Sequence, residues 1–348
     1  PGRSMNNREF WFDTAGKPIN AHGGGMLEYG GRFYWYGEHK TEGWAGRLAF
    51  HGVHCYESAN LTDWRDCGIV LPVSDDPASP IVRGCRIERP KVIYCRTTGK
   101  FVMYFHSTDE NHTIAKRGLA AADSPEGPFV FLGAARVNAG FAPLNMSAEE
   151  AAFPAGTIPP EPQLPNGEND EVKRYPIFRR DLAAGQMARD MNLFVDEDGT
   201  AYHIYSSEHN STIHIAELTP DCLGWSGRYV RVLPCGWNEG MALFRRGDAC
   251  HLLMSGCTSW EPNAARSASA PAVFGPWTPG GNPCRGPGAE TTFGCQSSAV
   301  FRAGERWIAM FDRWNPASFD RSTYVRLEIR FLSDGGYRID WTDEIQFG

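Results

Sequence analysis

The sequence has no excess of positive charge and no long hydrophobic run. Lysine and arginine total 34 against 41 acidic residues, which gives a net charge of −7 at pH 7. A nucleic-acid partner therefore has no electrostatic support, because such partners bind basic surfaces. No apolar stretch approaches the roughly 18 residues that a membrane-spanning helix needs. The sequence thus favours neither a nucleic-acid-binding nor a membrane-spanning protein.

The cysteines lack the spacing of a metal or redox motif. Ten cysteines are present, but no two of them form a Cys-x-x-Cys pair, so zinc and thioredoxin-type sites are weak interpretations. The carboxylates also lack the spacing of an EF-hand calcium loop. We expect no metal and no cofactor. Disulfides and free thiols are both open, and Cys55 and Cys67, which flank an expected turn, could pair.

The chain also lacks a Gly/Ser-rich or highly charged linker that would divide it into domains. Its 38 glycines and 24 prolines are typical of a turn-rich all-β chain, and all-β domains often exceed the usual domain length. Pro1 to Ser4, before Met5, look like residues added by a cloning vector. Residues 1–9 are therefore taken as a tail and 10–348 as a single domain. Localisation stays open: cytoplasmic if Met5 is the native start, secreted or periplasmic if a signal was removed.

What the sequence does contain is a short pattern that returns five times. Each copy opens with a polar residue, continues through an apolar run to a glycine-containing turn, and ends in an aromatic-rich run. The opening residues are His22, Glu88, Asp190, Glu239 and Gln296, and the turn glycines are Gly30, Gly99, Gly199, Gly247 and Gly304. Glycine supplies the positive φ of two-residue hairpin turns. Hairpins that recur about every 70 residues predict a propeller.

Further strand-like segments follow each hairpin. Gly52–Tyr56 and Gly68–Leu71 follow the first, and Ile213–Glu217 and Tyr229–Leu233 follow the third. Their alternating and β-branched residues predict strands. Four strands in each of five units give an all-β fold, a five-bladed β-propeller.

Residues from about 135 to 187 do not fit this rhythm. They are rich in Pro, Ala and Glu, they include Ile158–Pro162, and they are too long for an ordinary connection. Ser147 could begin one helical turn. Because the stretch directly precedes Asp190, it is expected on the same face as the opening residues. It is either a rim or lid over a pocket or a surface insertion without a role.

The first strand of each propeller blade lines the central channel, so the five opening residues should form a ring there. Three carboxylates, an imidazole and an amide in one funnel are costly unless they are solvated or paired. Crowded carboxylates repel one another, which raises the pKa of one and makes it a proton donor near neutral pH. Glycoside hydrolysis needs such an acid and a second group that activates water. Trp35, Trp260 and Trp314 could stack on sugar faces. Taken singly, a glutamate at a strand start is more often a solvated strand end, and Trp35 is more often a core residue.

Five short motifs are informative as a set, although no single one would identify a family. They are AHGGG at Ala21–Gly25, YWYGE at Tyr34–Glu38, ERPKV at Glu88–Val92, RDM at Arg189–Met191 and VDEDG at Val195–Gly199. This set resembles glycoside hydrolase family 43, and most of all its exo-β-1,3-galactanase branch. The resemblance covers nearly the whole chain apart from the insertion. It implies a five-bladed propeller and an inverting hydrolase, in which an acid protonates the glycosidic oxygen while a base activates water from the opposite face.

The same resemblance implies roles for the ring. Glu239 would be the general acid and Asp190 would tune its pKa. Gln296, within Gly294–Ser298, would act as the base through its imidic-acid tautomer, because the usual blade-one aspartate is absent at Asn20–His22, as it is in that branch. The expected substrate contacts are Glu88, which would select galactose through its axial 4-hydroxyl, and His22, Glu38, His112, Glu208, Thr258 and Trp314.

Three segments depart from the branch and leave alternatives open. They are Asn238–Ala242 around the acid, His112 in place of an expected tyrosine, and Tyr324–Glu328 in the closing strand. The favoured function is an exo-acting hydrolase that releases galactose from β-1,3-galactan, with an oligo- or polysaccharide as its partner. A β-galactofuranosidase or α-L-arabinofuranosidase on the same fold is one alternative. The missing aspartate also leaves open a non-catalytic sugar-binding propeller.

Overall fold

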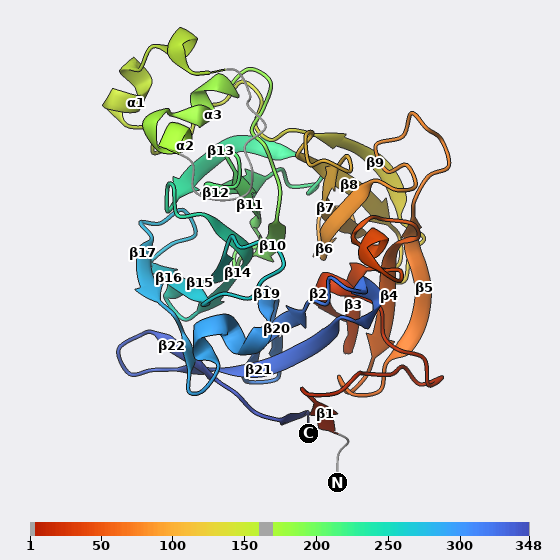
Figure 1. Cartoon of the computed structure of the whole chain (residues 1–348). Helices are drawn as coiled ribbons and strands as arrows, with labels where there is room; N and C mark the ends of the chain where they lie inside the picture. The colour runs from red at the N-terminus through yellow and green to blue at the C-terminus, as the bar shows by residue number, and fades with distance from the viewer. Residues whose placement is uncertain (1–3, 160–169, 348) are drawn as a thin grey trace.

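Five sheets surround a central axis as the blades of a propeller (Figure 1). The structure, a computed structural model, describes residues 4–159 and 170–347. The strands, from the axis outwards, are β2 (His22–Tyr29), β3 (Arg32–Glu38), β4 (Gly52–Ser58) and β5 (Arg65–Pro72) in blade 1; β6 (Arg86–Cys95), β7 (Lys100–Thr108), β8 (Lys116–Ala122) and β9 (Val130–Ala135) in blade 2; β10 (Met191–Val195), β11 (Ala201–Ser207), β12 (Thr212–Leu218) and β13 (Trp225–Val232) in blade 3; β14 (Asn238–Arg246), β15 (Ala249–Gly256), β16 (Arg266–Ala270) and β17 (Thr278–Gly281) in blade 4; and β19 (Gln296–Ala303), β20 (Arg306–Arg313), β21 (Thr323–Phe331) and β22 (Tyr337–Asp340) in blade 5. The predicted single-domain five-bladed propeller is confirmed.

The first hairpin of every blade turns at the glycine that the sequence pattern marked. Gly30, Gly99, Gly199, Gly247 and Gly304 have φ values of 60°, 69°, 87°, 57° and 63°. Residues with a β-carbon rarely adopt this left-handed conformation, whereas glycine does so freely. The turns therefore fix the register of the innermost strand pair in each blade.

The ends of the chain meet beside blade 5 and correct one expectation. β1 (Ser4–Asn6) pairs antiparallel with β23 (Glu344–Gln346). Met5 is buried, and the side-chain amide of Asn7 donates to the carbonyl oxygens of Arg326 and Thr342 at 2.9 Å each. The expectation of a tail over residues 1–9 is therefore wrong for residues 4–7, because an apolar side chain and a satisfied amide anchor them to the fold.

Blade 5 also has one strand more than the four expected. β18 (Cys284–Arg285) lies parallel to β22 on the outer edge of the sheet. The chain that precedes β19 thus adds a fifth strand to the outer edge of blade 5. The repeat pattern in the sequence did not predict this strand.

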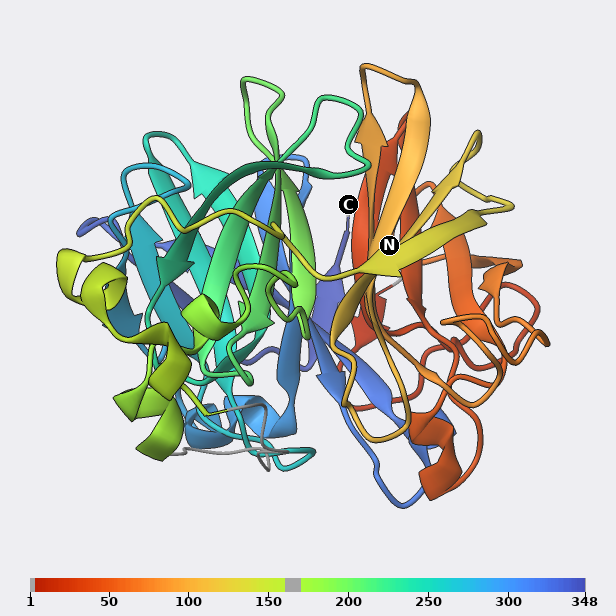
Figure 2. The same cartoon turned by 90° about the horizontal axis from the view of Figure 1, so that it is seen from above.

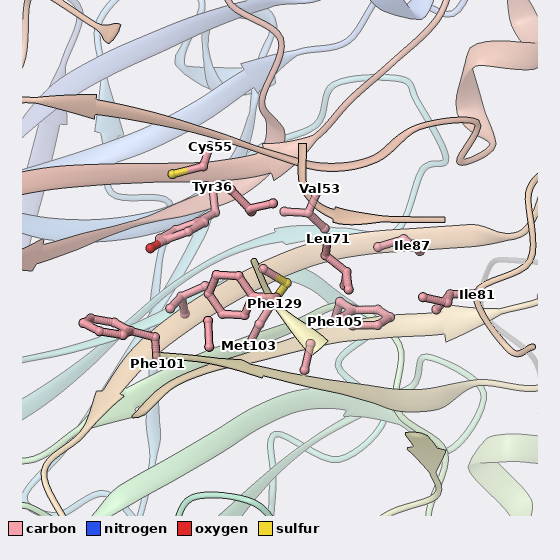
Figure 3. Packing of buried hydrophobic residues seen from close by; sticks show 14 of the residues in the cluster. Tyr36, Val53, Cys55, Leu71, Ile81, Ile87, Phe101, Met103, Phe105 and Phe129 are labelled. Atoms are coloured by element: carbon pink, nitrogen blue, oxygen red, sulfur yellow. The ribbon is translucent and has the colours of Figure 1, made fainter. Parts of the chain in front are cut away.

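Hydrophobic side chains fill the spaces between neighbouring blades. Between blades 1 and 2, Tyr36, Val53, Leu71, Met103 and Phe105 pack against one another (Figure 3). Close packing of this kind between strand faces of adjacent sheets contributes most of the favourable energy of folding. It also sets the blades at fixed distances, so the polar residues at their inner edges keep a defined geometry.

Trp35 belongs to the cluster between blades 5 and 1 and not to a sugar-binding surface. Its side chain is 1% exposed and lies edge-on to Trp64, with ring centroids 5.4 Å apart. The expectation that Trp35 could stack on a sugar is wrong, since its inward-facing position in β3 buries it in the core.

The insertion before blade 3 forms short helices beside that blade (Figure 2). These are α1 (Ala148–Ala152), η2 (Ala155–Thr157), α2 (Asp170–Arg174) and α3 (Ile177–Arg180). Ser147 caps α1 in a reciprocal arrangement with Glu150, which confirms the predicted helical turn. Glu150 also pairs with Arg231 of β13 at 2.5 Å. Part of the Ile158–Pro162 stretch lies outside the described residues, so the role of a lid stays a prediction.

The structure also bears on the expectations about membrane-spanning helices and disulfides. Within the described ranges, no helix combines the length and the apolar character needed to cross a bilayer. All ten cysteines are free thiols, so Cys55 and Cys67 do not form the disulfide that the sequence left open.

Candidate active site

In four blades the innermost strand is irregular immediately after its opening polar residue. The pairing register shifts between His22 and Gly25 in β2, Glu88 and Lys91 in β6, Glu239 and Ala242 in β14, and Ser297 and Ala299 in β19. A β-bulge bends its strand and re-aims the side chains beside it. The bulge in β14 requires glycine at position 240, because the φ of Gly240 is 58° and a β-carbon there would lie 2.4 Å from the carbonyl oxygen of Ser297. Blades 4 and 5 can approach closely at this point, which brings Glu239 and Gln296 together.

The polar residues surround a cavity of about 190 Å³. All five blades contribute to its wall, and four of the five opening residues belong to it. The lining residues are Glu38, Arg86, Glu88, Arg89, His106, His112, Arg189, Asp190, Asn210, Glu239, Ser259, Trp260, Gln296 and Trp314. Among the described residues of the insertion, none lines this pocket. The predicted ring is thus brought together by the fold, with His22 as its one exception.

Glu239 has the environment of a proton donor. Burial and the nearby charge of Asp190 raise the pKa of Glu239 to about 7, against the hydrogen bond from Asn210, which lowers it. Asn210 donates to Oε1 of Glu239 at 2.6 Å, and the amide of Gln296 approaches Oε2 at 3.3 Å. A carboxyl group with a pKa near 7 holds its proton over part of the neutral pH range.

Gln296 is held in one orientation by four neighbours. Its Oε1 accepts hydrogen bonds from Nη2 of Arg89 at 2.7 Å and from Nε1 of Trp314 at 2.9 Å. Its Nε2 faces Oγ of Ser255 at 3.0 Å and the carboxyl group of Glu239. Since guanidinium and indole nitrogens can only donate, the amide oxygen must face them and the amide nitrogen must face Glu239.

Arg89 joins the two sides of the pocket. Besides its bond to Gln296, its Nε lies 3.1 Å from Oδ2 of Asp190 and its backbone N–H donates to Oε2 of Glu38 at 3.1 Å. Its φ is 54°, an uncommon conformation for a residue with a β-carbon, which persists only where the surroundings enforce it. The same Oδ2 of Asp190 accepts the backbone N–H of Gly240 at 2.9 Å. Asp190 is therefore fixed close to Glu239, although the described contacts include no hydrogen bond between these two side chains.

Glu88 lines the same cavity and is surrounded by Arg86, His106 and His112. Burial alone would raise the pKa of Glu88, but His112, His106 and Arg86 hold it well below its usual range. Arg86 Nη1 lies 3.0 Å from Oε1, and His106 Nδ1 lies 3.1 Å from Oε2. Burial lowers the pKa of His112 to about 4, so that imidazole is neutral at pH 7. An ionised carboxylate beside a neutral imidazole can accept and orient sugar hydroxyls.

Glu88, His106 and His112 also offer ligand atoms within 4.8 Å of one another. Two imidazoles and a carboxylate are donor types that zinc and other transition metals bind. However, Arg86 already contacts Oε1 of Glu88, and Nε2 of His106 is buried with no hydrogen-bond partner among the described residues. A metal-bound histidine normally donates its second N–H to an acceptor. These three residues therefore suit a sugar hydroxyl better than a cation.

Three of the expected substrate contacts lie elsewhere. His22 is fully buried beneath Trp314 and stacks on Tyr324, with ring centroids 4.7 Å apart. The backbone of His22 occupies the expected position at the start of the innermost strand. Its imidazole, however, faces away from the pocket, with Nδ1 3.5 Å from Oδ1 of Asp312. The expected contact of His22 with a sugar is corrected accordingly.

Glu208 and Thr258 are also not among the described residues that line the cavity. Glu208 is 2% exposed and is enclosed by two contacts of 2.9 Å to Arg231 and one of 2.6 Å to His214. Thr258 donates its hydroxyl to the carbonyl oxygen of Glu261 at 2.6 Å, on the exposed loop beside the pocket-lining Ser259. The expectation for Glu208 is wrong, because this side chain is buried in ion pairs. Thr258 is exposed beside the pocket, so its contact with a sugar stays a prediction.

Sequence reasoning missed Arg89, Arg189 and Asn210 as pocket residues. A signal existed for the two arginines, since each directly adjoins an opening residue, Glu88 or Asp190. Asn210 gave no such signal. It follows β11 in a turn, and only the packing of blade 3 against blade 4 brings it to Glu239.

Solved structures with the same architecture identify the family. With a TM-score of 0.91, the chain matches a GH43 β-1,3-galactosidase determined with galactodeoxynojirimycin, at 39% identity over 99% of this chain and 100% of that one. The chain belongs to glycoside hydrolase family 43. It is a glycoside hydrolase with a carbohydrate substrate, and the alternative of a non-catalytic propeller falls away.

Other family 43 structures extend the match. The exo-β-1,3-galactanase of Phanerochaete chrysosporium, solved with β-1,3-galactotriose, is 26% identical, with a TM-score of 0.79 over 99% of this chain and 69% of that one. The exo-β-1,3-galactanase of Clostridium thermocellum is 29% identical, with a TM-score of 0.78 over 99% of this chain and 66% of that one. No protein-family model and no curated protein matches the chain. The resemblance to the exo-β-1,3-galactanase branch is confirmed.

Proposed function

We propose that the protein is an exo-acting, inverting hydrolase that releases galactose from the end of β-1,3-galactan. The observation that carries the proposal is the raised pKa of Glu239, about 7, in a pocket lined by all five blades. The related structures indicate the sugar, since they are a β-1,3-galactosidase and two exo-β-1,3-galactanases. A cavity of about 190 Å³ suits a terminal sugar better than the middle of a polymer.

Glu239 is the proposed general acid. In its protonated form it would donate its proton to the glycosidic oxygen as the bond to the leaving sugar breaks. Positioned proton transfer of this kind typically accelerates a reaction by about 10²–10⁴-fold. Asp190 stays close enough to raise the pKa of Glu239 and is itself fixed by Arg89 and Gly240, so it would keep the acid protonated without taking part in the transfer.

Gln296 is the proposed base, and its contacts set a condition on that role. In inverting enzymes the acid and the base are about 6.5–9.5 Å apart, which leaves room for a water. Here the two side chains touch, with 3.3 Å between Nε2 and Oε2. A sugar ring that enters the pocket must therefore separate them. Arg89 and Trp314 would meanwhile keep hold of Oε1. In the imidic-acid tautomer of Gln296, Oε1 carries a proton and Nε2 has a free lone pair, so Nε2 would accept a proton from the attacking water.

Glu88 is the proposed recognition group for the terminal galactose. Its ionised carboxylate, fixed by Arg86 and His106, would accept hydrogen bonds from two neighbouring hydroxyls. A buried site that is built to pair a hydroxyl strongly rejects a sugar whose hydroxyl points elsewhere. Glu38 and His112 line the same cavity and would complete the contacts to the ring.

The test is product analysis with β-1,3-galactan and β-1,3-galactobiose. The expected result is galactose as the only early product, first seen by NMR as the α-anomer, because inversion of a β-linkage gives α-galactose. Early β-galactose would exclude inversion, and early larger fragments would exclude exo action. Cleavage of aryl furanosides in preference to aryl β-galactopyranosides would transfer the proposal to a galactofuranosidase or an arabinofuranosidase.

A further inference from the structure

A row of aromatic rings leads from the pocket to an exposed tryptophan. Trp314 and Trp260 line the pocket, with ring centroids 5.1 Å apart. Trp260 lies edge-on to Phe319 at 4.7 Å, and Trp44 contacts the same phenyl ring at 5.8 Å. Phe319 is fully buried, whereas 52% of Trp44 is exposed. Two indoles thus flank one buried ring, one inside the pocket and one outside it.

The loop that carries Trp44 is fixed to the loop of blade 5. Trp44 begins the short helix η1 (Trp44–Arg47), and Phe319 begins η4 (Phe319–Arg321). The backbone N–H of Gly43 donates to Oγ of Ser318 at 2.9 Å, and the N–H of Phe319 donates to the carbonyl of Gly43 at 3.3 Å. A β-carbon on Gly46 would lie 2.0 Å from the carbonyl oxygen of Thr41 and 3.2 Å from Cβ of Phe319. The two loops are therefore packed too closely for η1 to shift freely.

The indole of Trp44 is also held in its orientation. The guanidinium of Arg47 lies 4.8 Å from the ring centroid, and the same group donates to the carbonyl oxygen of Trp44 at 3.2 Å. Arg47 is anchored in turn by Glu110 of blade 2 at 3.1 Å. Such cation–π contacts restrain an aromatic ring at modest energy. A large aromatic side chain that is exposed yet restrained is typical of a binding surface, because little conformational entropy is left to lose when a ligand arrives.

We infer that Trp44 and Trp260 form a shelf that binds the β-1,3-galactan chain on the leaving-group side of the scissile bond. This inference rests on the proposed function. The proposed function places one terminal galactose in the pocket, so the remaining chain must cross the rim. The apolar C–H face of galactose fits an indole, and Trp260 at the pocket and Trp44 beyond it place two indoles in succession beside the shared Phe319 ring.

The test compares Trp44→Ala with Phe12→Ala, a control that removes another ring of similar exposure, 53%, outside the pocket wall. Each protein is assayed on polymeric β-1,3-galactan and on an aryl β-galactoside, which has no sugar on the leaving-group side. We expect Trp44→Ala to lower kcat/KM on galactan about tenfold more than on the aryl substrate, mainly through KM. Phe12→Ala should leave the ratio of the two unchanged.

A binding measurement separates the shelf from catalysis. In a Glu239→Gln background, affinity for β-1,3-linked galacto-oligosaccharides should rise with their length, and Trp44→Ala should abolish the part of that rise beyond the disaccharide, since Trp260 remains. Equal losses on both substrates, or an unchanged rise of affinity with length, would overturn the shelf and leave the proposed function standing. A parent protein that cleaves neither galactan nor the aryl galactoside would overturn both.

Discussion

Nδ2 of Asn210 donates a hydrogen bond of 2.6 Å to Oε1 of Glu239, across the boundary between blades 3 and 4. Asn210 is the last of three consecutive residues with positive φ, after Glu208 and His209. Such a run is costly for residues with a β-carbon and persists only where the structure enforces it. Here it points the amide of one blade at the proposed acid of the next. The strained turn is thus part of what holds Glu239.

Asn210→Ala should move the basic limb of activity upwards. The hydrogen bond from Asn210 lowers the pKa of Glu239, so its removal should raise that pKa above about 7. The basic limb of the profile of kcat/KM against pH reports the ionisation of the acid in the free enzyme, and it should shift to higher pH. Asn145→Ala is the matched control, because Asn145 donates to a backbone carbonyl at the exposed edge of blade 3. A limb that stays in place, or moves down, contradicts this account.

Glu239→Gln should strongly slow the turnover of substrates with a poor leaving group. The loss of proton donation is expected to cost about 10²–10⁴-fold in kcat. A dinitrophenyl leaving group needs little protonation, so the loss should be much smaller on dinitrophenyl β-galactoside. Glu305→Gln, at a side chain that is 99% exposed, is the control. Equal losses on both substrates would argue against the acid role.

Glu239→Gln should also stabilise the protein at high pH. The pKa of Glu239 is about 7 in the folded state, against about 4.3 for an unperturbed glutamate. Because the pKa of Glu239 is higher in the folded state, its protonated form contributes fully to the free energy of unfolding below about pH 4.3. This contribution is lost as the pH rises through about 7. Glu239→Gln removes this loss and should raise the free energy of unfolding by about 1–3 kcal/mol at pH 8. Chemical denaturation at pH 4 should show almost no difference, and an equal gain at both pH values would count against a buried protonated acid.

Substitutions of Gln296 test both its role and its orientation. Gln296→Glu should keep one oxygen on Arg89 and Trp314, while the other replaces Nε2, now 3.3 Å from Glu239. Two carboxyl groups at that distance repel when both are ionised, so the basic limb of activity should shift to higher pH. Gln296→Ala should lose turnover if this amide is the base. Near-normal kcat in Gln296→Ala, measured on β-1,3-galactobiose, would assign the base to another residue.

Local patterns predicted the blades because each hairpin carries its own signal. The turn glycines, the alternating strands and the opening residues act within about ten residues of chain, and Glu88, Asp190, Glu239 and Gln296 consequently meet as predicted. What could not be predicted depends on contacts between blades. Whether Trp35 faces the core, or whether Glu208 meets Arg231, is decided by side-chain direction and by packing with distant segments. The same holds for His22: its backbone lies where the repeat predicts, but the direction of its imidazole depends on packing and could not be predicted.

Arg231 should prove to be a main support of the turn that carries Asn210. Burial alone would raise the pKa of Glu208, but Arg231 and His214 lower it to about 2. A depressed pKa stabilises the fold above pH 4.3 and loses this contribution as the pH falls towards 2. Arg231→Met leaves Glu208 buried beside His214 without its guanidinium, which should cost about 3–5 kcal/mol of unfolding free energy at pH 7.

That cost should shrink as the pH falls from about 4.3 towards 2, because the parent protein loses the same ion pair by protonation of Glu208. Urea denaturation at several pH values measures this directly. Arg302→Met is the control, since Arg302 pairs with Glu305 on the surface, where side chains are 50% and 99% exposed and an ion pair contributes little. Because the Arg231 contacts hold the turn, Arg231→Met should also shift the basic limb of activity in the direction expected for Asn210→Ala. A variant that loses stability equally at every pH, with an unmoved limb, would show that Arg231 supports blade 3 without positioning the acid.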